Sequence, residues 1–295
     1  MRLGLALTSF CSIVCISPAQ ATEGGGGAYP NGIETLASAT IPPPGTYLIG
    51  YTNFYDADRL NDGAGDSLVP DFDIDAASQS LRFVHVTRTK ILGATWAMHA
   101  IATGATLDVH AAGAHQSKTG LADLVVDPLI LSWTKGPYQL TTGLDVIVPI
   151  GTYRAGDLAN IGRNYWTFEP IVAVSRFDPA GGLEASAKMM VDFNTRNTAT
   201  DHKSGTEFHA DLALGYNFNP IAIAATGYVY KQLGDDTQNG AKVGTDGYRG
   251  SAFAVGPMVR YQLGQVPVFA QWQHEFHTEN RPQGDKFWLR ANVRF

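Results

Sequence analysis

The stretch KFWLRANVRF, from Lys286 to Phe295, decides the fold. Every second residue from Phe287 to Phe295 is apolar, and the residues between them include three cations, Lys286, Arg290 and Arg294. Successive side chains of a β-strand point to opposite faces, so this stretch predicts a strand with one apolar face and one charged face.

The same period of two recurs along the chain from Thr46 onward. Twelve strands are expected, at about 46–55, 78–90, 93–103, 121–134, 137–148, 163–175, 181–193, 204–218, 220–232, 251–262, 266–276 and 284–295. Short turns alternate with long polar loops, at 56–77, 104–120, 149–162, 194–203, 233–250 and 277–283. This pattern is typical of an all-β, antiparallel transmembrane β-barrel of the outer-membrane type, here over residues 46–295.

A secreted β-sandwich is the alternative, because its strands alternate too. Two features favour the barrel: charge recurs on the polar face of strand after strand, and the last strand ends in an aromatic residue. The outward residues of that strand are expected to be the signal read by outer-membrane assembly machinery: Phe287, Leu289, Val293 and Phe295. Pro128, Pro170 and Pro257 fall within expected strands, where a barrel without edges requires bulges or strand ends.

The composition excludes several other classes of protein. Charged residues make up 16% of the chain, against about 25% in soluble domains. The aromatic residues (Trp 5, Tyr 12, Phe 14) are too many for a disordered chain. A mean hydropathy of -0.07 is too polar for a bundle of transmembrane helices. With a net charge of -6 and no basic run, nucleic acid is not an expected partner.

The first 45 residues precede the expected barrel. Arg2, an apolar stretch from Leu3 to Ile16, and an Ala-x-Ala end are the parts of a secretory signal peptide, residues 1–21, with cleavage expected after Ala21. It contains the only two cysteines, so no disulfide is expected in the exported chain. Residues 22–45, rich in Gly and Pro, are expected to be flexible, either as a periplasmic tail or as a plug in the lumen. Both ends of the exported chain are expected on the periplasmic side.

Several sequence blocks resemble one known family. They are residues 122–133 (ADLVVDPLILSW), 148–153 (VPIGTY), 160–170 (NIGRNYWTFEP), 192–195 (DFNT), 204–211 (SGTEFHAD) and 227–232 (GYVYKQ). The chain is similar, from about Pro42 to Phe295, to the outer-membrane proteins of the phenol meta-cleavage pathway. One departure is Asp201-His202, where the family has an aromatic residue.

The resemblance implies a function as well as a fold. Genes of this family often lie beside genes for aromatic degradation, and its members are inferred to take up aromatic or other apolar compounds passively. For this chain it implies a channel in the outer membrane of a Gram-negative bacterium, with the lipid bilayer and small apolar or aromatic solutes as its partners.

The polar faces of the expected strands should line the lumen. By parity, and by position for those near strand ends, the lining residues are Asp145, Arg163, Glu169, Glu184, Lys188, Asp192, His209, Asp211, Arg260, Gln271, Gln273, Glu275, Lys286, Arg290 and Arg294. Both signs of charge are mixed, which favours a salt-bridged, narrow lumen over an ion-selective ring. Glu184, Lys188 and Asp192 share one face of a strand and are expected to form a ladder of charges that neutralise one another.

Two other functions stay open. A barrel enzyme of the lipase or acyltransferase kind could bring Ser and His together from neighbouring strands without a local motif. A structural barrel without transport is the third reading. No cofactor is expected, and His274 and His277 leave their strand on opposite faces, so they do not predict a metal site.

Overall fold

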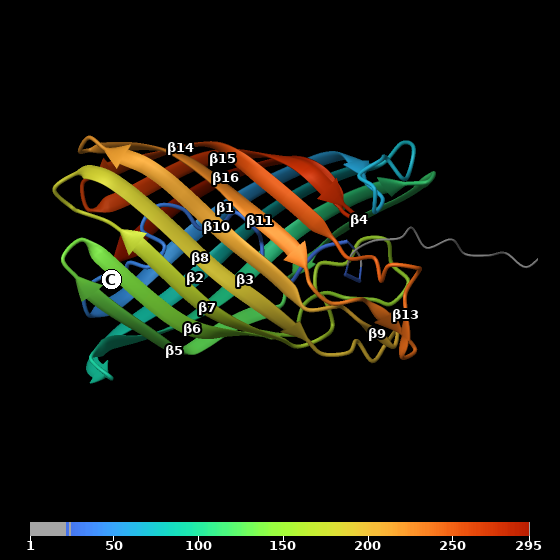
Figure 1. Ribbon diagram of the computed structural model, residues 1–295, viewed down its shortest axis with the longest axis horizontal. Coiled ribbons are helices and arrows are strands. Elements are labelled where there is room, and N and C mark those ends of the chain that lie inside the picture. Colours follow the sequence, from blue (N-terminus) through green and yellow to red (C-terminus); the bar gives the residue numbers. More distant parts are fainter. Residues whose placement is uncertain (1–21, 24, 295) are drawn as a thin grey trace, which may run out of the picture.

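The computed structural model describes residues 22–23 and 25–294, and the expected signal peptide and Phe295 lie outside them. Twelve antiparallel strands form a closed barrel (Figure 1). They are β1 (Gly45–Leu60), β2 (Asp73–Ile91), β3 (Ala94–Ala111), β5 (Leu124–Lys135), β6 (Tyr138–Val148), β7 (Thr167–Arg176), β8 (Gly182–Asn194), β10 (Glu207–Asn217), β11 (Ile221–Gln232), β14 (Ser251–Leu263), β15 (Val266–Glu279) and β16 (Pro282–Arg294). β1 pairs with both β2 and β16, which closes the ring. The predicted barrel of twelve strands is confirmed.

The burial pattern of the strands is the reverse of that in a soluble protein. Along β7, Phe168, Val172 and Val174 are exposed, whereas Thr167 and Glu169 are buried. Apolar side chains on the outside suit a lipid surrounding, and polar side chains on the inside must find partners across the lumen. In the described part of the chain, no helix is long and apolar enough to cross a membrane.

The two ends of the barrel differ. Short turns and the C-terminal end of β16 lie at one end, and the long loops lie at the other (Figure 1). There β9 (His202–Lys203), β12 (Thr237–Gln238) and β13 (Ala241–Lys242) form a small three-stranded sheet. By the usual orientation of such barrels, the short turns are periplasmic and the long loops extracellular.

Two expected loops and several strand boundaries are wrong, among them the end of β1 at Leu60 and the start of β2 at Asp73, which both fall within the expected loop 56–77. Residues 104–120 are not a loop but the end of β3 and most of an extra strand, β4 (Ala114–Leu121), which pairs with β3. Residues 277–283 contain only a tight connection between β15 and β16. β7 begins at Thr167, so Arg163 lies in the preceding loop. The added part of β3 turns Leu107 and Val109 to the inside and carries polar Asp108 and His110 on its outer face, so it lacks the apolar outer face that marks the other strands.

The three prolines are accommodated in two ways. At Pro128 the register of β5 shifts against both β3 and β6, so the expected bulge is present. The Asp127 carboxylate fills the gap by accepting hydrogen bonds from the Leu129 and Leu144 amides, at 2.8 and 2.9 Å. At Pro170 and Pro257 the register is kept, and pairing is interrupted on one side only. A proline has no N–H to donate, so each of these two prolines costs the sheet one backbone hydrogen bond and needs no bulge.

The segment before β1 lies inside the barrel. The Glu23 carboxylate accepts hydrogen bonds from Tyr153 and Asn197 in the long loops, at 3.0 and 2.7 Å. At the other end, Thr40 donates to Gln139 of β6, close to the short turns. The segment therefore runs the length of the lumen. Its start lies at the long-loop end, which corrects the expectation that both ends of the exported chain lie on the periplasmic side.

Candidate functional site

The lumen is organised around one carboxylate of the N-terminal segment, Glu34. Its oxygens lie 2.9 Å from Arg82 of β2, 3.4 Å from Arg290 of β16 and 3.9 Å from Lys188 of β8. Glu34 is buried, and no more than about a fifth of the three cationic side chains is exposed. Three strands from different parts of the wall thus hold the segment through charge-assisted contacts, which are stronger than neutral ones.

A second wall carboxylate, Asp211 of β10, shapes the backbone of the segment. It accepts hydrogen bonds from the Tyr29 hydroxyl at 2.8 Å, the Gly32 amide at 2.8 Å and the Glu34 amide at 3.0 Å. From the other side, the Gln271 amide donates to the Gly32 carbonyl at 2.6 Å. Gly32 has a φ of +85°, and a Cβ there would meet the Gln273 side chain. Glycine is therefore required at this turn.

Serines of the wall complete the contact with the segment. Ser186 of β8 accepts a hydrogen bond from the Ala37 amide at 2.8 Å, and Ser175 of β7 accepts one from the Ala39 amide at 2.9 Å. The Thr141 hydroxyl donates to the Ala39 carbonyl at 2.6 Å. Backbone groups without secondary structure are satisfied by the barrel wall, as buried backbone groups must be.

The expected ladder of three charges on β8 does not neutralise itself. Glu184 forms a two-pronged ion pair with Arg260 of β14, at 2.8 and 2.9 Å. Lys188 contacts Glu34 and lies over the Tyr29 ring, 4.9 Å from its centroid. The charged side chains of this ladder therefore pair with other elements rather than with one another: Glu184 with β14, Lys188 with the N-terminal segment.

The last rung, Asp192, belongs to a buried cluster of three titratable groups. His209 Nε2 lies 3.3 Å from Asp192 and 3.4 Å from Glu169, and each side chain is no more than 1% exposed. The Tyr29 ring of the segment stacks on the His209 ring, 4.6 Å between centroids. A protonated His209 would balance one of the two carboxylates, and the three groups are of types that bind metal ions.

Another histidine links the wall strands near Glu34. His99 Nε2 lies 2.8 Å from the Asp145 carboxylate, and Arg82 donates to His99 Nδ1 at 2.8 Å. A nitrogen that accepts from Arg82 carries no proton, so His99 is neutral and donates from Nε2 to Asp145. Arg82 is thereby held in place for Glu34.

Tyrosines provide neutral donors to the remaining carboxylates. Glu275 of β15 accepts from Tyr55 at 2.9 Å and from Tyr228, and it lies 3.2 Å from Lys286. Glu207 accepts from Tyr230 at 2.9 Å. These aromatic hydroxyls satisfy buried charge without adding more charge to the lumen.

A cavity of about 440 Å³ remains between the segment and one side of the wall. Its wall side is formed largely by apolar residues of β2, β3, β5 and β6, among them Ile74, Ala76, Ile101, Ala105, Leu107, Val109, Val125 and Ile147. Aromatic rings of Tyr29, Tyr51, Tyr55 and Trp288 line it as well, and its charged lining includes the cations Arg82, Arg163, Lys188, Arg281 and Lys286. A cavity of about 150 Å³ suffices for benzene, so this one has room for a one- or two-ring compound.

The residues expected in the lumen lie as follows. Asp145, Glu169, Glu184, Lys188, Asp192, His209, Asp211, Arg260, Gln271, Gln273 and Glu275 are buried, and Lys286 and Arg290 are partly buried. Arg163 borders the cavity from a loop. Arg294 is exposed at the end of β16, with its guanidinium 5.8 Å from the centre of the Tyr47 ring.

Sequence analysis missed Arg82, His99 and Glu207, and although a plug was one of its two readings of residues 22–45, it named no residue of that segment as a contact. A signal existed for Arg82, because its neighbours Leu81 and Phe83 are apolar and both are exposed on the outer face. Glu34 had no such signal, since no periodicity extends into residues 22–45.

Comparison with known proteins gives the family. The family described as "Putative MetA-pathway of phenol degradation" matches residues 57–291. The chain belongs to this family. A comparison with curated proteins found no match.

Solved structures support the fold. The chain is similar to an outer membrane channel from Pseudomonas putida F1, with 16% identity and a TM-score of 0.76 over 88% of this chain and 98% of that one. It is also similar to the β domain of the Bordetella autotransporter BrkA, with 13% identity and a TM-score of 0.52 over 85% and 100% of the two chains. The chain thus has the fold of outer-membrane β-barrels and belongs to the phenol-degradation family.

Proposed function

We propose that this barrel is a passive channel that admits small apolar or aromatic compounds through the outer membrane. The observation that carries the proposal is the cavity of about 440 Å³ inside the lumen, with apolar strand residues on one side and aromatic rings on the other. Membership of a phenol-degradation family supports a compound of this chemistry. In a purely structural barrel, side chains would be expected to fill this apolar space between the salt bridges.

The N-terminal segment divides the lumen and limits what passes. It is pinned at Glu34 and Asp211, while the cavity lies beside it along β1 to β3. A hydrated ion meets fixed charges of both signs in this space, so no charge class is favoured. An uncharged ring loses little on leaving water and gains contact with apolar side chains.

The barrel needs no catalytic group for this role. Among the described residues, the polar partners of the histidine side chains are Thr46, Arg82 and carboxylates, and no hydrogen bond joins a histidine to a serine. The arrangement that would support a lipase-like enzyme therefore has no counterpart among these contacts.

Blocking the cavity tests the proposal. Ala105→Trp places an indole from β3 into the cavity, whereas Ala102→Trp places the same group on the outer face of the same strand. We expect Ala105→Trp to slow phenol or toluene entry into proteoliposomes, and Ala102→Trp to leave it unchanged. Equal rates for both variants and the parent, with both inserted, would contradict passage through this cavity.

The route to the membrane is part of the proposal. We infer export by the signal peptide, cleavage after Ala21, and recognition of the last strand by the assembly machinery. Phe287, Leu289 and Val293 are exposed on the outer face of β16, as such a signal requires. Deletion of Phe295 should reduce the amount of heat-modifiable, inserted protein, and normal insertion would refute its role.

A further inference from the structure

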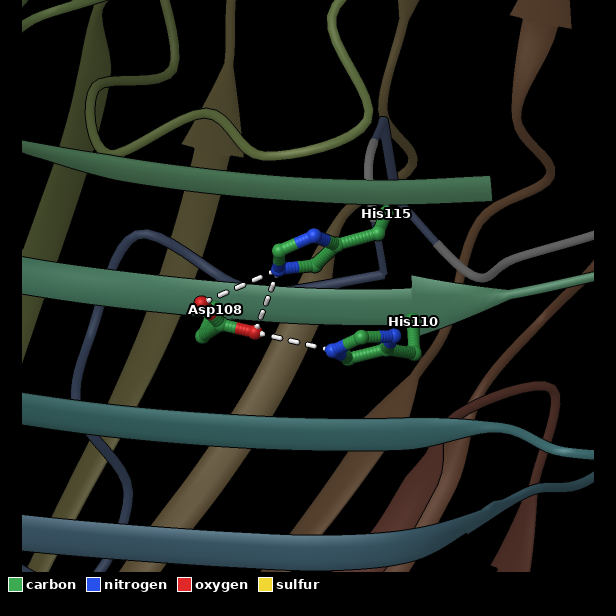
Figure 2. Close-up of side chains that lie close together, drawn as sticks. All are labelled: Asp108, His110 and His115. Carbon is green, nitrogen blue, oxygen red and sulfur yellow. Dashed lines mark hydrogen bonds and ion pairs between the residues drawn. The ribbon is translucent and has the colours of Figure 1, made fainter. Parts of the chain in front are cut away.

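The β3–β4 hairpin carries three side chains close together, Asp108, His110 and His115 (Figure 2). Two residues, Ala112 and Gly113, form its turn, and both have positive φ angles of 52° and 78°. This conformation is that of a tight hairpin turn whose twist matches the strands. It fixes the register that sets His110 directly opposite His115.

The register brings the two imidazoles together. Ala111 and Ala114 close the turn, so the next pair, His110 and His115, is of the kind not joined by backbone hydrogen bonds, in which side chains lie closest. Their rings are 4.0 Å apart and nearly parallel. Asp108, two residues before His110, leaves β3 on the same face.

Three ligand atoms converge between these residues. Asp108 Oδ1 lies 3.3 Å from His110 Nε2 and 3.0 Å from His115 Nε2. The ligand atoms of all three residues lie within 4.8 Å of one another. Two ligand atoms bound to one tetrahedral zinc ion are separated by about 3.3–3.4 Å. The existing spacing is therefore close to that of a metal site, before any side chain moves.

We propose that Asp108, His110 and His115 bind a divalent transition metal of the zinc type on the outer face of this hairpin. Two imidazoles and one carboxylate favour Zn²⁺, Ni²⁺ or Cu²⁺ over Mg²⁺ and Ca²⁺, which prefer oxygen ligands. The side chains are a third to a half exposed, so an ion can enter and keep at least one position for water.

Neighbouring carboxylates raise the concentration of cations at this place. Asp75 lies opposite Asp108 in the β2–β3 register, Asp56 lies opposite Asp75, and Asp285 lies opposite Asp56. This row of aspartates crosses four strands and borders a shallow outer cavity of about 360 Å³. Its negative potential attracts cations, while the two histidines determine which cation stays.

The bound ion would fasten the hairpin. β4 pairs in the barrel sheet with β3 alone, so its other edge has no strand neighbour among the described residues. A metal bridge from His115 to His110 and Asp108 joins the two strands one residue before the turn-closing pair. The proposal thus adds a metal-dependent clamp at the long-loop end of the barrel.

Zinc titration of the full chain, without a histidine tag and in detergent, tests the proposal. Calorimetry with ZnCl2 at pH 7.5 should give one site, and MgCl2 should not compete for it. His110→Ala and His115→Ala should each weaken binding at least tenfold. The matched control is His274→Ala, because His274 also faces one aspartate, Asp285, at 3.0 Å but has no second histidine in its cluster. This control should bind zinc as the parent does.

Two results would overturn the proposal. One is a parent protein that binds no zinc, or binds it equally well in the double variant of His110 and His115. The other is zinc binding that is unchanged at pH 5, since protonated imidazoles cannot bind a metal. The pH titration uses the parent alone, so it decides the matter even if a variant fails to fold.

Discussion

The carboxylate of Glu34 and the guanidinium of Arg82 are 2.9 Å apart, and this ion pair joins the lumen segment to the barrel wall. Arg82 is itself fixed by His99, which is fixed by Asp145. The segment is therefore attached to a rigid part of the wall rather than to a flexible loop. This attachment should determine how often the N-terminal segment leaves the lumen.

Glu34→Gln should loosen the segment. The change removes the charge that three cations share, at a cost of about 1.5–3 kcal/mol for a charge-assisted contact. The population with a displaced segment should rise by about 10- to 150-fold. We expect longer or more frequent open events in planar bilayers. The control is Glu279→Gln, which removes an exposed carboxylate at the end of β15 that pairs with Lys231 of β11. Similar traces for the two variants would contradict the role of Glu34.

Lys188→Glu should do more, because it sets a second carboxylate beside Glu34. Repulsion should displace the segment, and the added negative charge should favour cations in the lumen. The reversal potential in a salt gradient should shift toward cation selectivity, less so at high salt where charges are screened. An unchanged potential at low salt in an inserted, conducting variant would show that Lys188 does not border the path.

The strand pattern could be predicted from the sequence because lipid imposes a strict apolar face on every strand. Phe287 and Leu289 of β16 are exposed as their spacing requires. The apolar outer face ends where lipid ends, so it could not predict the extension of β3 or the hairpin that β3 forms with β4. The charges of the wall could be assigned to the inner face. Their partners could not be predicted, because Glu34 and Tyr29 come from a segment without periodic hydrophobicity.

The pair of Glu184 and Arg260 should behave as a buried ion pair. Removing one member, as in Glu184→Gln or Arg260→Met, leaves a buried charge alone and should cost about 3–5 kcal/mol. The double variant should recover much of this loss. Urea unfolding in detergent micelles or vesicles, followed by the heat-modifiable band, measures the loss in the free energy of unfolding for the two single variants and the double variant. Additive losses would mean that the two side chains act independently.

Leu289→Arg should harm folding far more than Arg290→Leu. Leu289 faces outward, where an arginine in the middle of the membrane costs about 2–4 kcal/mol. Arg290 faces inward, and its loss leaves Glu34 with Arg82 and Lys188. Folding yields into lipid vesicles compare the two, and an equal or reversed order would mean that the assignment of the faces is wrong.

The loops at residues 195–206 and 233–250, here called the loop cap, should respond to pH through Asp236. Burial raises the pKa of Asp236 to about 6, although the Gly205 amide and Gln232 donate to its carboxylate at 2.7 and 2.6 Å. A raised pKa means that the protonated form favours the folded cap, so this contribution is complete below about pH 4 and is lost as pH rises through 6. Burial lowers the pKa of the neighbouring His202, which acts in the opposite sense.

Asp236→Asn isolates the carboxyl from His202, because asparagine resembles the protonated acid. Above pH 6 the variant should have a more stable cap than the parent, by up to about 3 kcal/mol, and the difference should vanish near pH 4. Hydrogen exchange of residues 195–206 and 233–250 measures this difference in cap stability. A difference that does not change with pH would exclude titration of Asp236 as its cause.

The path of the lumen segment has a topological consequence. It passes through a ring that its own chain closes, since β1 continues from the segment and pairs with β16. The segment cannot leave sideways while that seam holds, and it can be withdrawn only lengthwise, toward Gly45. A folded domain or bulky label joined ahead of Glu23 would remain outside at the long-loop end and act as a stopper. Such a molecule would be threaded permanently, and only opening of the seam between its first and last strands would release it.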